Sequence, residues 1–168
     1  MASLATLSPR YAKLSAIFIG DGPTRPDVEA EIARLNLGQI VKYRGRVDHR
    51  EVPAIMRSAH VVVLPSYMAG EMFPLCLIEG MALGLPAIGT RWSGIPEIIV
   101  DGESGIVVEP RDEVGLARAI ERFLTEPAFY KRASRNALAR VQSHYTASAV
   151  VRAYSHEYEA ALREYRKA

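Results

Sequence analysis

The sequence has little cysteine, little net charge and no long hydrophobic run, and each shortage excludes a class of protein. Its single cysteine, Cys76, cannot form an internal disulfide, and the four histidines show no zinc-site spacing. A formal net charge of +2 does not favour non-specific binding to nucleic acid. No apolar run approaches the roughly 20 residues that span a bilayer, and residues 1–15 lack a signal-peptide pattern. We therefore expect a cytoplasmic protein with no metal, no cofactor and no nucleic-acid partner.

The size and composition are those of one ordinary domain. The chain has 168 residues, of which 49% are hydrophobic and 24% charged. These values are close to the averages for globular proteins and argue against disorder or low-complexity structure. A chain of this length buries roughly 70% of its unfolded surface, so we expect a single domain over residues 1–168.

Short apolar segments alternate with helical patterns along the first two thirds of the chain. The expected strands are residues 16–20, 40–43, 61–64, 87–88 and 106–108. The valines of the segment 61–64 favour a strand covered on both faces. Because parallel neighbours need a helical crossover, the alternation predicts an α/β fold with a doubly wound parallel sheet. After residue 108 the pattern is helical, so we expect additional C-terminal helices.

Several helix starts carry capping signals. Thr24 with Asp27, and Asp48 with Glu51, have the spacing of capping boxes. Asp112 is expected to cap a later helix. The expected buried face of that helix consists of Val114, Ala117, Ile120 and Leu124. The next helix should open at Thr125 and Pro127 and run to about His144.

A last helix, from about Ala147, carries an apolar stripe along its full length. The stripe consists of Val151, Tyr154, Tyr158, Ala161, Leu162 and Tyr165. Such a stripe needs a partner surface, so we expect either self-association through this helix or a mobile segment beyond about Tyr154.

In an open parallel sheet the ligand site lies at the carboxyl ends of the strands, so the loops after them are the candidates. Pro74 is expected in the first turn of a helix that runs to about Leu83, which places Glu71 just before this helix and Glu79 inside it. The backbone N–H groups of residues 73–76 and the helix dipole suit a phosphate. Carboxylates beside such a site can accept hydrogen bonds from sugar hydroxyls, although spacing alone also fits two solvated surface charges.

Other motifs are absent or incomplete. The dinucleotide fingerprint fails because Arg25 stands where a third glycine is required after Gly20 and Gly22, and no P-loop is present. We expect Cys76 in the core rather than as a nucleophile, and His49 as a surface residue.

Around this loop the sequence resembles the retaining glycosyltransferases of the two-Rossmann-domain (GT-B) architecture, in the large group 1 family of bacterial sugar transferases and sucrose and glycogen synthases. The matching motifs are Leu64-Pro-Ser66, Glu71-Met-Phe-Pro-Leu-Cys-Leu-Ile-Glu79, Gly80-Met-Ala-Leu-Gly-Leu-Pro86, Gly94-Ile-Pro-Glu97 and, upstream, Gly20-Asp-Gly-Pro23. The resemblance covers about residues 16–125. It implies the Rossmann-like C-terminal half of the architecture, with the first strand and the N-terminal acceptor domain missing from this sequence.

The resemblance also implies roles for individual residues. Glu71, the catalytic candidate, would contact hydroxyls of the transferred sugar, and Glu79 would contact the ribose. The backbone of residues 72–75 would meet the sugar and diphosphate, and the loop at Arg46 and Val47 would face the base. The implied substrate-binding residues are Glu71, Met72, Phe73, Pro74, Leu75, Glu79, Arg46, Val47 and Gly22.

The implied activity is transfer of a hexosyl group from a UDP-, GDP- or ADP-linked sugar to an acceptor that the sequence does not name. The missing N-terminal domain is a further expected partner, and the sequence leaves open whether the intact enzyme lies on the inner face of the membrane. This fragment alone is expected to bind without turnover. Two alternatives remain: a non-catalytic nucleotide-binding module, which needs no Glu71, and a glycoside hydrolase whose paired carboxyls face each other at about 5–10 Å.

Overall fold

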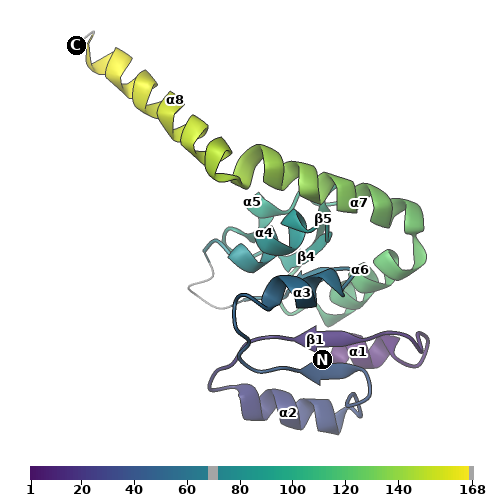
Figure 1. The fold of residues 1–168 in the computed structure, drawn as a ribbon. Helices are drawn as coiled ribbons and strands as arrows, with labels where there is room; N and C mark the ends of the chain where they lie inside the picture. Colours follow the sequence, from purple (N-terminus) through teal and green to yellow (C-terminus); the bar gives the residue numbers. More distant parts are fainter. Residues whose placement is uncertain (68–71, 167–168) are drawn as a thin grey trace.

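The computed structural model describes residues 1–67 and 72–166. Strands and helices alternate as far as residue 108, and helices follow to the C-terminal end (Figure 1). The strands are β1 (Ala16–Phe18), β2 (Val41–Tyr43), β3 (Val62–Leu64), β4 (Ala87–Thr90) and β5 (Gly105–Val108). The helices are α1 (Ala2–Leu7), α2 (Arg25–Arg34), α3 (Val52–Arg57), α4 (Leu75–Ala82), α5 (Ile95–Ile98), α6 (Glu113–Thr125), α7 (Pro127–Arg140) and α8 (Ala147–Tyr165), with a π-helical turn, η1 (Val141–Tyr145), between α7 and α8.

The strand pairs are parallel, which confirms the predicted α/β class. β1 pairs with β2, with Ala16 opposite Val41. β4 lies between β3 and β5, and Ala87 faces both Val62 and Gly105. The hydrogen-bonded strands therefore form a two-stranded and a three-stranded parallel sheet, rather than the single ladder that the alternation predicts.

The three-stranded sheet is covered on both faces. Ala87 of β4 and Val107 of β5 pack with Leu77 of α4 and Ile98 of α5. Their chain neighbours point to the other face, as expected for a strand, and pack with α6. Helix α7 contributes to both apolar clusters. This packing fixes α4 against the sheet.

Helix α1 was not anticipated from the sequence. Leu4 of α1 packs with Leu37 and with Val41 of β2 in a third apolar cluster. The Ser3 hydroxyl donates a 2.8 Å hydrogen bond to the Glu113 carbonyl of α6. Helix α1 thus joins the two-stranded sheet to the rest of the chain through α6.

Two strands are less buried than their composition indicates. Ile17 in β1 and Val63 in β3 are each 39% exposed. The expectation that the strand at residues 61–64 is covered on both faces is therefore wrong. The physical reason is packing over the faces: the neighbours of these two residues in each strand pack against the described apolar clusters, whereas Ile17 and Val63 point to the opposite face and belong to none of these clusters.

The two predicted capping boxes are not formed among the described residues. Thr24 precedes α2, but its ψ of 3° departs from the extended backbone of a capping residue, and its side chain caps nothing. The Asp48 carboxylate is held by Arg50 instead, and α3 begins after Glu51. The expected cap at Asp112 is confirmed, because its carboxylate accepts a 2.8 Å hydrogen bond from the Gly115 N–H.

The C-terminal helices differ in detail from the predicted ones. In α6 the buried face contains Ala119 and Phe123, whereas Val114 and Leu124 are exposed. Phe123 takes this place because it packs on Phe129 of α7, with the ring centroids 5.0 Å apart. Helix α7 ends at Arg140 rather than near residue 144, since the π-helical turn follows.

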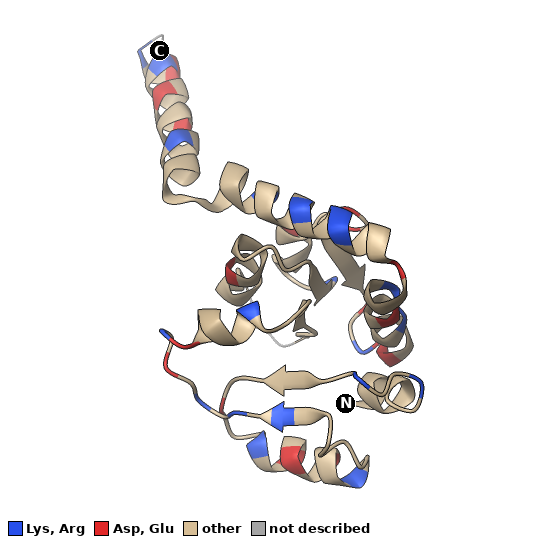
Figure 2. Cartoon of the chain, turned by 45° about the vertical axis from the view of Figure 1, so that its right-hand side comes forward, with Lys and Arg blue, Asp and Glu red and all other residues tan. Residues whose placement is uncertain are grey.

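Helix α8 extends away from the rest of the chain (Figure 1). Within the described residues it buries only Ala149, and Lys/Arg and Asp/Glu side chains are interspersed along it (Figure 2). In the described part of the chain, no helix is both long and apolar enough to cross a membrane.

Candidate functional site

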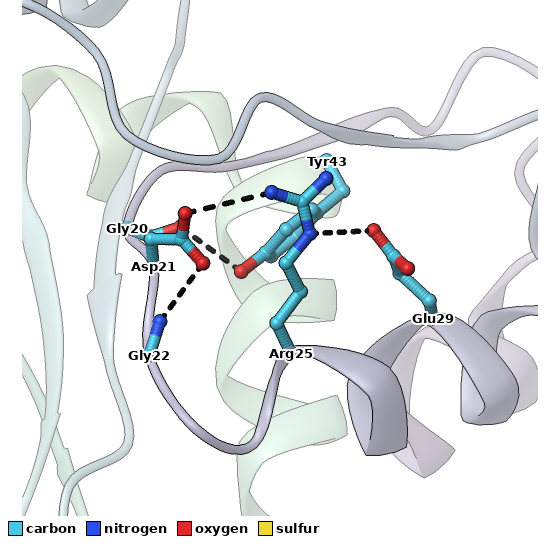
Figure 3. A network of polar contacts seen from close by, with 6 residues as sticks. All are labelled: Gly20, Asp21, Gly22, Arg25, Glu29 and Tyr43. Carbon is cyan, nitrogen blue, oxygen red and sulfur yellow. Dashed lines mark hydrogen bonds and ion pairs between the residues drawn. The ribbon is translucent and has the colours of Figure 1, made fainter.

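The loop after β1 is held in shape by the end of β2. The Gly20 N–H donates a 2.9 Å hydrogen bond to the Gly45 carbonyl, and the Tyr43 hydroxyl donates one of the same length to the Gly20 carbonyl. Arg25, in the first turn of α2, lies over the Tyr43 ring at 5.4 Å and pairs with Asp21 (Figure 3). Arg25 therefore braces this loop at the position where a dinucleotide-binding protein would need glycine.

The same network leaves Gly22 facing open space. A Cβ added at Gly22 would meet no described heavy atom within 4 Å, whereas one at Gly45 would approach the Arg25 guanidinium at 3.3 Å. Gly45 also has a φ of +62°, the left-handed region that favours glycine. The backbone at Gly22 is thus open, and the absence of a side chain at Gly45 leaves room for the Arg25 guanidinium.

The loop after β2 is rigidified by an ion pair. The Arg50 guanidinium donates hydrogen bonds of 3.0 and 2.7 Å to the Asp48 carboxylate, and the Arg50 backbone N–H donates a third. These bonds, the side-chain ones first, lower the pKa of Asp48 to about 2. In this loop Arg46 is exposed and Val47 half-buried.

Glu79 lies on α4 and faces the loop after β2. Its Oε1 atom is 3.9 Å from Nε2 of His49, and its side chain is 39% exposed. A carboxylate in this position is accessible to a ligand and close to the Arg46–Val47 loop. The structure therefore brings together His49 and Glu79, which are thirty positions apart in the sequence.

The N-terminus of α4 opens on the same side. Pro74 is the N-cap, with a ψ of 102°, rather than a first-turn residue as predicted. Met72, Phe73 and Leu75 are exposed, while Leu77 is fully buried and anchors the helix. The first N–H groups of a helix lack intrahelical partners, so this end can bind an anion. Glu71 falls within residues 68–71, outside the described residues.

Two contacts near the site were not foreseen from the sequence. His49 is 81% exposed, as expected of a surface residue, and its imidazole lies beside Glu79. Tyr145 of η1 packs edge-on against Phe73, with the ring centroids 5.8 Å apart. Neither has a local sequence signal, because both contacts join distant segments. Among the described residues, no group of three or more His, Cys, Asp or Glu side chains is placed to hold a metal ion.

Comparisons with known proteins agree with this architecture. An alpha-D-kanosaminyltransferase from Streptomyces kanamyceticus is 32% identical over 145 residues, which cover 86% of this chain and 37% of that protein. The structure of a sucrose-phosphate synthase from Thermosynechococcus elongatus matches with a TM-score of 0.79 and 28% identity, over 97% of this chain and 42% of the other. The Anabaena protein HepE, solved in complex with UDP-glucose, has the same fold, with a TM-score of 0.79 and 20% identity over 95% of this chain and 44% of the other.

The chain thus spans roughly two fifths of these relatives. The family model described as glycosyl transferases group 1 matches residues 2–140, which include both sheets, the site loops and α4. On this evidence the chain belongs to the glycosyl transferases group 1 family.

Proposed function

We propose that this chain is the donor-binding domain of a retaining glycosyltransferase that transfers a hexosyl group from a nucleotide diphosphate sugar to an acceptor. The observation that carries the proposal is the convergence of Glu79, the N-terminus of α4 and the loop after β2 on one rim. This rim lies at the carboxyl ends of parallel strands, where α/β sheets bind their ligands.

Each part of the rim has a role in this proposal. Glu79 accepts hydrogen bonds from the ribose hydroxyls, and the Arg46–Val47 loop and Gly22 lie along the nucleotide. The backbone of residues 72–75 contacts the sugar and diphosphate. As the sugar–phosphate bond breaks, negative charge grows on the departing diphosphate, and the positive end of the α4 dipole stabilises it. Glu71 contacts the sugar hydroxyls in this scheme.

The first nucleotide to test is UDP, because a protein of the same fold has been solved with UDP-glucose. GDP, ADP and their sugar conjugates complete the panel. Ligands that bind only the folded state raise its melting temperature, so a thermal-shift series ranks them. We expect weak binding, with a dissociation constant of about 1 mM. We also expect no sugar transfer by this chain alone, since it spans only part of its relatives.

Calorimetry on two variants tests the assigned roles. Glu79→Ala should weaken binding of the free nucleoside diphosphate, whereas Glu71→Ala should weaken only the additional affinity for the sugar conjugate. Each lost charge-assisted hydrogen bond should cost about 1.5–3 kcal/mol. Glu164→Ala, at an exposed position on α8, is the matched control. Equal and negligible effects of all three variants would refute the roles, and sugar hydrolysis without nucleotide binding would favour a hydrolase.

A further inference from the structure

The π-helical turn η1 stands between α7 and α8 and touches the loop before α4. Turns of this kind are rare and occur frequently at functional sites. Val141, at its start, is buried in the same cluster as Leu77 of α4. Tyr145, at its end, is half-buried and packs against that cluster. Both ends of η1 are therefore fixed on the core.

Tyr145 is anchored at its hydroxyl by α5. The hydroxyl donates a 2.8 Å hydrogen bond to the Glu97 carbonyl. Arg140 holds the C-terminal end of α5, because its guanidinium donates hydrogen bonds to the carbonyls of Glu97 and Ile98. The same guanidinium lies 5.7 Å from the Tyr145 ring centroid. The orientation of the Tyr145 ring is thus set by α5 and α7.

The ring of Tyr145 reaches the loop that precedes α4. It meets Phe73 edge-on, at 5.8 Å between centroids and with 68° between the ring planes. Phe73 is 48% exposed and Met72 is 74% exposed, so neighbouring side chains give this segment little other support. An edge-on aromatic pair supplies a directional contact beyond simple burial.

The segment before α4 also lies against Gly94, at the start of α5. A Cβ added at Gly94 would lie 2.0 Å from the Met72 carbonyl oxygen. The backbone of Met72 therefore lies directly against the backbone at Gly94, while Phe73 lies against Tyr145. Helix α5 supports both contacts, since Gly94 precedes it and Glu97 anchors Tyr145.

We propose that Tyr145 is a positioning residue of the donor site: by holding Phe73 it fixes the backbone of residues 72–75 in the conformation that binds the sugar diphosphate. This inference rests on the proposed function. Tyr145 itself touches no ligand in this scheme, and it acts through the segment whose N–H groups do.

Three variants separate positioning from general stability. Tyr145→Leu removes the ring contact but keeps apolar bulk, and Tyr145→Phe keeps the ring and loses only the hydroxyl, with its hydrogen bonds to the Glu97 carbonyl and from Arg140. Tyr130→Leu is the matched control, because Tyr130 makes a similar edge-on contact with His60, at 6.3 Å, and packs against the other apolar cluster. Each variant of the full chain is measured for its melting temperature, for UDP and UDP-glucose affinity and for amide hydrogen exchange.

We expect Tyr145→Leu to weaken UDP-glucose binding about three- to tenfold, the range set by one aromatic pair. Tyr145→Phe should restore affinity to within about twofold of wild type, and Tyr130→Leu should leave affinity unchanged even where it lowers the melting temperature as much. Wild-type affinity in Tyr145→Leu, or an equal loss in Tyr130→Leu, overturns the inference.

Hydrogen exchange needs no ligand and therefore distinguishes the two proposals. Tyr145→Leu should speed exchange of the Leu77 amide, which donates to the Pro74 carbonyl, about tenfold, while Tyr130→Leu should not. If wild-type protein binds none of the nucleotides but this change is seen, the proposed function fails and the positioning contact stands. If nucleotides bind and exchange at the Leu77 amide is the same in Tyr145→Leu and wild type, the positioning inference fails alone.

Discussion

Nε2 of His49 lies 3.9 Å from Oε1 of Glu79, so the loop after β2 and helix α4 meet at the rim where the nucleotide is proposed to bind. The two side chains are 81% and 39% exposed. Exposed pairs of this kind contribute little to stability, because water screens them. The importance of this contact is therefore its position beside the proposed ribose site.

The first prediction concerns His49. His49→Gln should lower UDP affinity about two- to threefold while leaving the melting temperature unchanged, because the imidazole lies beside the carboxylate proposed to bind the ribose and the exposed pair adds little stability. Calorimetry and thermal unfolding provide the two measurements. His60→Gln, on a residue that packs against Tyr130 instead, is the control and should not change affinity. Unaltered affinity in both variants would remove His49 from the site.

The second prediction is a titration of Asp48. Hydrogen bonds from Arg50 hold its pKa at about 2, below the ordinary value of 3.8. A lowered carboxyl pKa contributes stability that is fully present above the ordinary value and is lost as the pH falls toward 2. In Arg50→Gln the pKa should rise, but stay below 3.8, because the backbone N–H at position 50 remains.

Carbon-detected NMR of the Asp48 carboxyl group measures this titration directly. Arg44→Gln changes another exposed arginine of the same loop and should leave the Asp48 pKa where it is. An Asp48 pKa near 3.8 in the wild-type chain would show that the ion pair with Arg50 does not form in solution.

The third prediction concerns the contact of α4 with β3. A Cβ added at Gly80 would lie 2.8 Å from Cγ1 and 2.9 Å from Cβ of Val62, so the helix and the strand approach closely at this glycine. Gly80→Ala should lower the free energy of unfolding by about 1–3 kcal/mol through overpacking. Gly38→Ala, where an added Cβ meets no described heavy atom within 4 Å, should change it by no more than about 0.5 kcal/mol.

Urea unfolding of both variants tests the packing, and a double variant adds a second check. Adding Val62→Ala to Gly80→Ala should recover part of the loss, because residues in direct contact are energetically coupled. Strict additivity of the two substitutions would mean that the helix shifts away from the strand instead of being strained against it.

The fourth prediction concerns the apolar stripe of α8. Tyr154, Tyr158 and Tyr165 are 63%, 69% and 82% exposed, so the stripe has no partner within the described part of the chain. We expect concentration-dependent self-association through this helix, with fast hydrogen exchange beyond about Tyr154 in the dilute monomer. Light scattering over a dilution series, combined with exchange across residues 147–166, measures both.

Substitution on the stripe provides the control for that experiment. Tyr158→Glu should abolish the association, whereas His156→Glu, on the other side of the helix, should not. A chain that stays monomeric at all concentrations, with α8 protected from exchange, would contradict the prediction.

Much of the architecture follows from local sequence patterns. Short valine- and isoleucine-rich segments followed by helical periodicity predict β1 to β5 and their parallel pairing, since parallel strands need helical crossovers. Asp112 marks the start of α6, and Pro127 that of α7. The periodicity of residues 147–165 likewise predicts α8. These features depend on residues close together in the chain, which the sequence displays directly.

The errors have a common origin. Whether β3 is covered on both faces depends on which helices pack over each face, and the direction of the Asp48 carboxylate depends on Arg50 competing with the helix end. Which residues of α6 face inward depends on Phe123 meeting Phe129. Local propensities are worth a few tenths of a kcal/mol to about 1 kcal/mol, so tertiary packing overrides them easily.

The sequence by itself determined the α/β class, the order of the five strands and the longer helices, and the place of Glu79 within a helix that follows the site loop. Only the tertiary structure decided that His49 stands beside Glu79, that Arg25 braces the loop at Gly20 and that Tyr145 supports Phe73. Each of these contacts joins segments that are distant in the chain. Their geometry depends on how the sheets and helices pack together, which periodicity and spacing along the chain do not encode.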